Sequence, residues 1–134
     1  MRYQRAEKPL KLAGLAAARE FFAGCFAEAD ASRETLWVAH VDEELNCLLL
    51  SRHDGDETGA SFPLRSIIAD AARHGSAGIV LAHNHPSGDS RPSESDCAVT
   101  RRLASAADAL DCRVVDHLIF AGAECTSFRQ AGLL

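Results

Sequence analysis

The stretch Leu81-Ala82-His83-Asn84-His85-Pro86-Ser87-Gly88 decides how the rest of the chain is interpreted. The almost wholly apolar run 77–82 leads into it, and Gly75 lies just before that run. A short apolar run between a glycine and a Pro-Ser-Gly turn is typical of a buried strand. Two histidines therefore follow a buried strand, at the place where open α/β sheets bind their ligands.

A carboxylate is predicted to lie beside the two histidines. His83 and His85 are two residues apart on extended chain, so their side chains point the same way. The turn at 86–88 reverses the chain, and a helix that begins near Ser93 brings Asp96 back in its first turn. Asp96 falls on the apolar face of that helix, where a divalent cation would neutralise its charge. Three such ligands leave one tetrahedral position open, as in catalytic zinc sites.

Other side chains that can bind metals are expected to be structural or solvated. Any one of the three ligands could instead be a turn histidine, a solvated histidine or a helix-capping aspartate, and only their combination favours a metal. Cys97 is expected to be a small core residue, and His40 a structural one within a strand. The polar loop 51–59 is expected to be solvated, including its metal-capable residues His53, Asp54, Asp56 and Glu57.

These motifs carry a family resemblance. The strings 83–86 (His-Asn-His-Pro) and 93–96 (Ser-Glu-Ser-Asp) resemble the signature of the JAB/MPN (JAMM) metalloprotease superfamily. The longer string 82–89 resembles the RadC-like branch in particular, as does Asp-His-Leu-Ile at 116–119. The likeness spans roughly residues 33–134.

The resemblance implies a zinc-dependent metallopeptidase. His83, His85 and Asp96 would bind Zn²⁺, and a zinc-bound water would attack a peptide or isopeptide carbonyl. Ser93 would stabilise the tetrahedral intermediate, and a glutamate from an upstream strand would act as the general base. Asp116 and His117 either support the site through a hydrogen bond or form a satisfied polar pair in a partly exposed strand.

The general base is not found where the resemblance implies it. The expected position, on the second strand of a hairpin, falls at 49–51, which reads Leu-Leu-Ser. Glu57 could serve only if its loop folds back over the metal. The alternative is therefore a catalytically weak or inactive zinc-binding module of the same fold, one that recognises a protein or peptide without cutting it.

The pattern of elements predicts an α/β fold with a mixed sheet and helices on its faces. This fits the three-layer JAB/MPN fold, which resembles that of cytidine deaminases. Residues 1–32 are expected to be an N-terminal extension with a helix that packs on the domain, and its first eleven residues to be mobile. Residues 33–134 form the RadC-like domain. The expected elements are helices 12–29, 61–74 and 93–110, and strands 36–41, 45–50, 77–82, 112–120 and 124–128.

Composition narrows the classes of function. The 134 residues suit one domain, and a net charge of −5 does not favour nucleic acid as a partner. The sequence has neither the spread histidines of an HNH nuclease nor the His-x-Glu and Pro-Cys-x-x-Cys strings of a zinc deaminase. No helix-hairpin-helix region is recognised ahead of the domain, so a link to DNA repair rests on the family label alone.

Location and partners follow from weaker signals. The five cysteines are scattered and odd in number, which suits reduced thiols in a cytoplasmic protein. No run is long enough to span a membrane, and the N-terminus does not read as a signal peptide. A protein or peptide substrate is expected. The Leu-rich strand 45–50, if it is an exposed edge, would be a homodimer contact.

Overall fold

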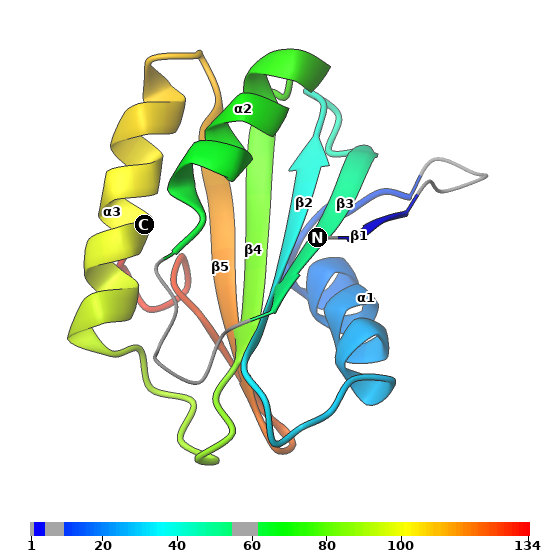
Figure 1. The fold of residues 1–134 in the computed structure, drawn as a ribbon, viewed down its shortest axis with the longest axis vertical. Helices are drawn as coiled ribbons and strands as arrows, with labels where there is room; N and C mark the ends of the chain where they lie inside the picture. Colours follow the sequence, from blue (N-terminus) through cyan, green and yellow to red (C-terminus); the bar gives the residue numbers. More distant parts are fainter. Residues whose placement is uncertain (1, 5–9, 55–61) are drawn as a thin grey trace.

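A single six-stranded sheet with helices on both faces forms the protein (Figure 1). This computed structural model describes residues 2–4, 10–54 and 62–134. The strands lie in the order β1-β3-β2-β4-β5-β6. In chain order the elements are β1 (Arg2–Gln4), α1 (Leu15–Ala27), β2 (Thr35–Val41), β3 (Cys47–Asp54), α2 (Leu64–His74), β4 (Gly78–Asn84), α3 (Glu94–Asp108), β5 (Arg113–Ala121) and β6 (Glu124–Ser127).

The sheet is mixed, as the sequence predicts. Strands β4 and β5 are parallel and are joined by the crossover helix α3, whereas the other neighbouring strands are antiparallel. The predicted order of elements is confirmed from α1 onward, and Gly75, with a left-handed φ of 60°, caps the end of α2. This α/β architecture is consistent with the JAB/MPN fold.

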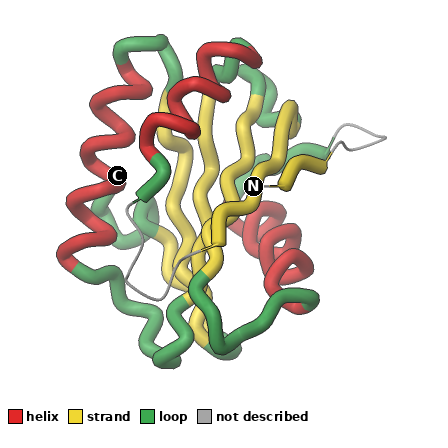
Figure 2. Tube along the Cα trace, viewed as in Figure 1, coloured by secondary structure: helices red, strands yellow, loops and turns green. Residues whose placement is uncertain are grey.

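The helices and the sheet form three layers (Figure 2). Two apolar cores lie between these layers. On one face α1 packs Ala18 and Phe22 against strand residues that include Leu50 and Leu118. On the other face α2 and α3 pack Ile67 and Leu103 against the central strands. The central strand β4 is buried along almost its whole length, which explains its near-continuous apolar sequence.

The structure corrects two expectations about the first strands. Residues 2–4, expected to be mobile, form β1 and pair with Leu50, Ser51 and Arg52 of β3. The segment before α1 also bonds to the hairpin, through Leu12 N–H to the Leu45 carbonyl. The Leu-rich strand is therefore not the free edge that the sequence suggested, because an N-terminal strand lies beside it.

Strand register determines which chain segments meet at the carboxyl end of β4. Leu36 of β2 pairs with His83 of β4 on one side and with His53 of β3 on the other. Because β2 runs antiparallel to both neighbours, its start lies beside their carboxyl ends. The hairpin turn at 42–46 lies at the opposite end, where Val41 pairs with Gly78.

Candidate metal centre

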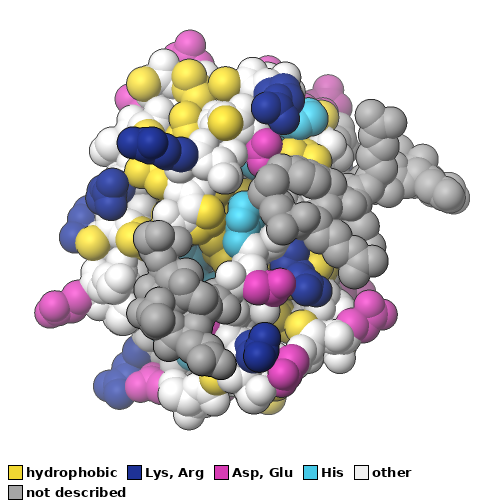
Figure 3. Space-filling view, viewed as in Figure 1, with side chains coloured by type: hydrophobic (Ala, Val, Ile, Leu, Met, Phe, Trp, Pro, Cys, Tyr) yellow, Lys and Arg dark blue, Asp and Glu magenta, His cyan; other side chains and the backbone are white. Residues whose placement is uncertain are grey.

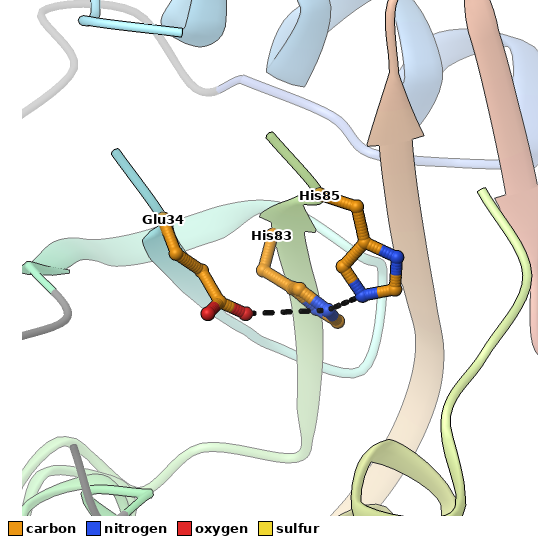
Figure 4. A group of neighbouring side chains, drawn as sticks. All are labelled: Glu34, His83 and His85. Carbon is orange, nitrogen blue, oxygen red and sulfur yellow. Dashed lines mark hydrogen bonds and ion pairs between the residues drawn. The ribbon is translucent and has the colours of Figure 1, made fainter. Parts of the chain in front are cut away.

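Two histidines and a glutamate meet at the carboxyl end of β4 (Figure 4). The Nε2 atoms of His83 and His85 are 3.0 Å apart, and Glu34 Oε1 lies 3.9 Å from His83 Nε2. Glu34 directly precedes β2, whose second residue pairs with His83. The three side chains form a candidate metal-binding triad.

Asp96 joins the same cluster from the first turn of α3. Its Oδ1 lies 3.4 Å from His83 Nε2, and its Oδ2 lies 3.1 Å from His85 Nε2. Ser93 caps the helix reciprocally: its backbone N–H donates to Asp96 Oδ2, and its hydroxyl accepts from the Asp96 N–H, both at 2.9 Å. This capping box fixes the carboxylate toward the two rings.

A chain of hydrogen bonds assigns the tautomer of His83. Thr100 donates its hydroxyl proton to the Asp96 carbonyl at 2.7 Å, so its oxygen accepts from His117 Nδ1–H, also at 2.7 Å. Burial holds the pKa of His117 well below the usual histidine value, so its ring is neutral and its Nε2 is an acceptor. That atom lies 2.7 Å from His83 Nδ1, which must therefore donate. Nε2, the ring nitrogen of His83 that faces the cluster, is then the one left to bind a cation.

His85 reaches the same state through a different partner. Its Nδ1 lies 2.7 Å from the carbonyl oxygen of Asp89, which can only accept, so Nδ1 carries the proton. The Asp89 side chain is held in turn by the exposed guanidinium of Arg91 at 2.7 Å. His85 Nε2 therefore also presents a lone pair to the cluster.

The cluster fits a bound cation. Two imidazole lone pairs face each other at 3.0 Å beside the Asp96 carboxylate, and such an arrangement is favourable only when a positive charge lies among them. Burial opposes the ionisation of Asp96, but the closeness of the His83 ring and the hydrogen bond from the Ser93 backbone N–H outweigh it and hold the pKa of Asp96 well below the usual range. Nδ1–H groups bonded to a ring nitrogen and to a carbonyl are the outer contacts typical of metal-binding histidines.

Glu34 is the member of the candidate triad that the sequence did not predict. The acid was sought on the second hairpin strand at 49–51, but that strand is β3, which β2 separates from β4. Leu49, Leu50 and Ser51 are buried in the middle of β3. An acid other than Asp96 does lie near the histidines, but at Glu34 and not at the position that the resemblance implies. The one signal in the sequence was that Glu34 lies just before a predicted strand. That position suggests a site only once the pairing of Leu36 with His83 is known.

The other proposed site residues have distinct surroundings. His117 bonds to His83, whereas the Asp116 carboxylate accepts from Ser127 Oγ and from the backbone N–H of Arg129, away from the cluster. Cys97 is half-buried in the first turns of α3. Glu57 and Asp56 lie outside the described residues.

The predicted loop 51–59 begins as regular strand. Ser51 to Asp54 belong to β3, where the hydroxyl of Ser51 bonds to His53 Nε2 at 3.1 Å. Asp54 pairs with Arg52 rather than with a metal-site residue.

On the face in Figure 3, acidic and basic side chains are both spread among apolar ones. Among residues 2–4, 10–54 and 62–134, no helix combines the length and apolar character that crossing a bilayer requires.

The chain belongs to the family of the RadC-like JAB domain, whose family model matches residues 14–133. The match includes α1, strands β2 to β6 and the candidate metal centre, but not β1. The division between an extension and a domain near residue 33 stays a prediction.

Several curated relatives are similar to this chain over part of its length. A UPF0758 protein of Thiobacillus denitrificans is 49% identical over 80 residues, which cover 60% of this chain and 36% of the relative. A UPF0758 protein of Nitrosococcus oceani is 40% identical over 106 residues, covering 72% and 47% of the two chains. One of Vibrio campbellii is 34% identical over 104 residues, covering 77% and 46%. The matched region thus spans less than half the length of each of these relatives.

Proposed function

We propose that this domain is a zinc-dependent hydrolase of peptide or isopeptide bonds. The observation that carries the proposal is the convergence of the His83 and His85 lone pairs and the Asp96 carboxylate, with Glu34 beside them. Structural zinc sites use four protein ligands, whereas a site with three keeps a position for water or substrate. Membership of the RadC-like JAB family supports the same class of chemistry.

We assign the metal to His83, His85 and Asp96 rather than to Glu34. The side chains of these three residues are 6–17% exposed, and hydrogen bonds fix each of them. The Glu34 side chain is 54% exposed and lies farther from the histidines. Two imidazoles and one carboxylate suit zinc, although nickel, iron and manganese accept similar ligands.

Zinc in such a site acts as a Lewis acid that activates water and polarises a carbonyl oxygen. The protein then has to move protons. Glu34 lies beside His83 and is open to solvent, so its carboxylate suits transfer of a proton from the attacking water to the leaving amine. The Ser93 hydroxyl accepts from the Asp96 N–H and keeps its own proton for an oxyanion of the substrate.

Glu34 supports an active hydrolase over the inactive module of the same fold. That alternative rested on an absent acid, and Glu34 lies close to His83. The substrate class comes from the family resemblance, because the names of the relatives state no activity. A cytoplasmic location, a protein partner and a homodimer remain predictions.

Elemental analysis of tag-free protein, beside four variants, tests the proposal. His83→Ala and Asp96→Ala should each lose the near-stoichiometric zinc of the parent, whereas Glu34→Gln should keep it. His53→Ala is the matched control, because His53 lies across β2 from His83 and pairs with the same residue, Leu36. This control should keep its zinc.

Hydrolysis of a library of internally quenched peptides and isopeptides, with Zn²⁺ as the only added metal, tests the chemistry. Glu34→Gln should lower the rate on any cleaved member by roughly 10²- to 10⁴-fold, the usual contribution of a general base. A parent that takes up no zinc after add-back would overturn the assignment of the metal. A zinc-loaded Glu34→Gln variant that hydrolyses at the parental rate would overturn the role of Glu34.

A further inference from the structure

We propose that Asn84 is a positioning residue that holds Glu34 against the two histidines. The inference rests on the role proposed for Glu34. Asn84 makes two short hydrogen bonds to the segment that carries the acid: its Oδ1 accepts from the Thr35 N–H at 2.7 Å, and its Nδ2 donates to the Arg33 carbonyl at 2.8 Å. One amide side chain therefore grips the backbone on both sides of Glu34.

Regular strand pairing does not reach Glu34. The ladder between β2 and β4 ends with the pair Leu36 and His83, two residues after Glu34. Glu34 itself precedes β2 and is exposed. The Asn84 amide continues the connection between the two strands beyond the end of the ladder, at the point where the acid stands.

The chemistry of this position favours asparagine. A single group must accept from one peptide unit and donate to another, and among short side chains only an amide offers both functions with fixed geometry. Both polar atoms of Asn84 are used in these bonds. Asn84 therefore acts through Glu34, not on a substrate. Because Asn84 lies between His83 and His85, the same end of β4 positions both the two histidines and Glu34.

The position of Glu34 can be measured without a substrate. In the Co²⁺-loaded protein, paramagnetic broadening of the Glu34 carboxylate carbon resonance reports its distance from the metal. Asn84→Ala should greatly weaken this broadening and should raise the rate of Thr35 amide exchange about tenfold, the effect of one lost hydrogen bond. Zn²⁺ affinity, from competition with a chromogenic chelator, should stay within about threefold of the parent because the ligands are untouched.

Two further variants serve as a control and as a substitute for Asn84→Ala. Asn46→Ala removes the other asparagine of the chain, whose Nδ2 bonds to Asp42 in the hairpin turn at the far end of the sheet. It should leave the Glu34 resonance and Thr35 exchange unchanged. Asn84→Asp keeps the acceptor for Thr35 but loses the donor to Arg33, and it serves if the alanine variant melts below the temperature of the experiment. It should give a smaller change in Thr35 exchange than Asn84→Ala.

A double-mutant cycle connects position to chemistry. On a peptide that the parent cleaves, Asn84→Ala should lower kcat by roughly 10- to 100-fold, as expected for a misplaced catalytic group. In a Glu34→Gln background the same change should alter kcat less than about twofold. Equal losses in both backgrounds, or a folded Asn84→Ala protein with parental broadening and exchange, would overturn the proposal. Failure of Glu34→Gln to slow hydrolysis would instead refute the proposed function, while Thr35 exchange would still test the Asn84 clamp.

Discussion

His117 and His40 are both fully buried on the sheet face that α2 and α3 cover, but their hydrogen-bond partners differ. Both ring nitrogens of His117 have partners, Thr100 and His83, and Phe128 stacks on the ring at 4.6 Å. His40 has one bond, from Nδ1 to the hydroxyl of Ser76 at 2.9 Å. Its Nε2 is buried without a hydrogen-bond partner among the described residues.

The comparison shows that burial of a histidine does not by itself indicate function. Burial lowers the pKa of both rings, so both are neutral near pH 7. His117 differs because its two hydrogen bonds connect Thr100 of α3 to His83 of the candidate metal centre. His40 lies at the other end of the sheet, where β2 and β4 pair Val41 with Gly78, and contributes to packing.

The largest loss of stability is expected from removing the Asp116 carboxylate, which binds the backbone of its neighbour His117. Asp116 accepts from the His117 N–H, the Ser127 hydroxyl and the Arg129 N–H. Asp116→Ala should lower the free energy of unfolding by roughly 3–5 kcal/mol, because three donors lose a charged acceptor. Urea denaturation measures this loss. Zinc affinity in the folded variant should stay near the parental value, and a large selective loss of zinc would show that Asp116 belongs to the metal site.

The lowered pKa of His40 predicts a dependence of stability on pH. Burial lowers this pKa from 6.5 to about 4. Between these values the unfolded chain binds a proton that the folded chain does not, so the free energy of unfolding falls as the pH falls through this window. The contribution of His40 is fully present above about pH 6.5, and its loss reaches about 3 kcal/mol near pH 4.

The variant His40→Leu isolates this contribution. Between about pH 7 and pH 4 its free energy of unfolding should decrease by about 3 kcal/mol less than that of the parent, because leucine does not titrate. Urea denaturation at a series of pH values measures the difference. Parallel curves for the two proteins would contradict the pKa assigned to His40.

Exchange of each buried histidine for leucine sharpens the comparison. His117→Leu should lower zinc affinity roughly 10- to 100-fold, since His83 loses the acceptor that fixes its tautomer. His40→Leu should leave zinc affinity unchanged. Chelator competition on both variants measures this. Equal affinities would remove the functional distinction between the two rings.

The smallest effects are expected from the hydroxyl partners of the two rings. Thr100→Val keeps the shape of the side chain but breaks the chain of bonds to His117, and should lower zinc affinity several-fold, the effect of about one hydrogen bond. Ser76→Ala removes the partner of His40 and should cost less than about 1.5 kcal/mol of stability, with no change in zinc affinity. Chelator competition and urea denaturation separate the two outcomes, and the reverse pattern would contradict the comparison.

Much of the fold could be predicted because the relevant signals are local. Apolar runs and helical spacing located α1, α2, α3 and the central strands, and the capping residue Ser93 marked the start of α3. Residues 51–54 were expected to be loop, since they are polar. They form strand because Trp37 and Val38 of β2 pair with Arg52 and Ser51, and hydrogen bonds between strands compensate for the polar side chains.

The sequence by itself determined the cluster of His83, His85 and Asp96, because a strand end, a turn and the first turn of a helix bring these three together within fourteen residues. Only the tertiary structure decided the rest of the site. Glu34 and His117 reach His83 from sequence separations of 49 and 34 residues. Their approach depends on which strand lies beside β4 and in which register, and this is decided by how side chains from distant parts of the chain pack on the two faces of the sheet.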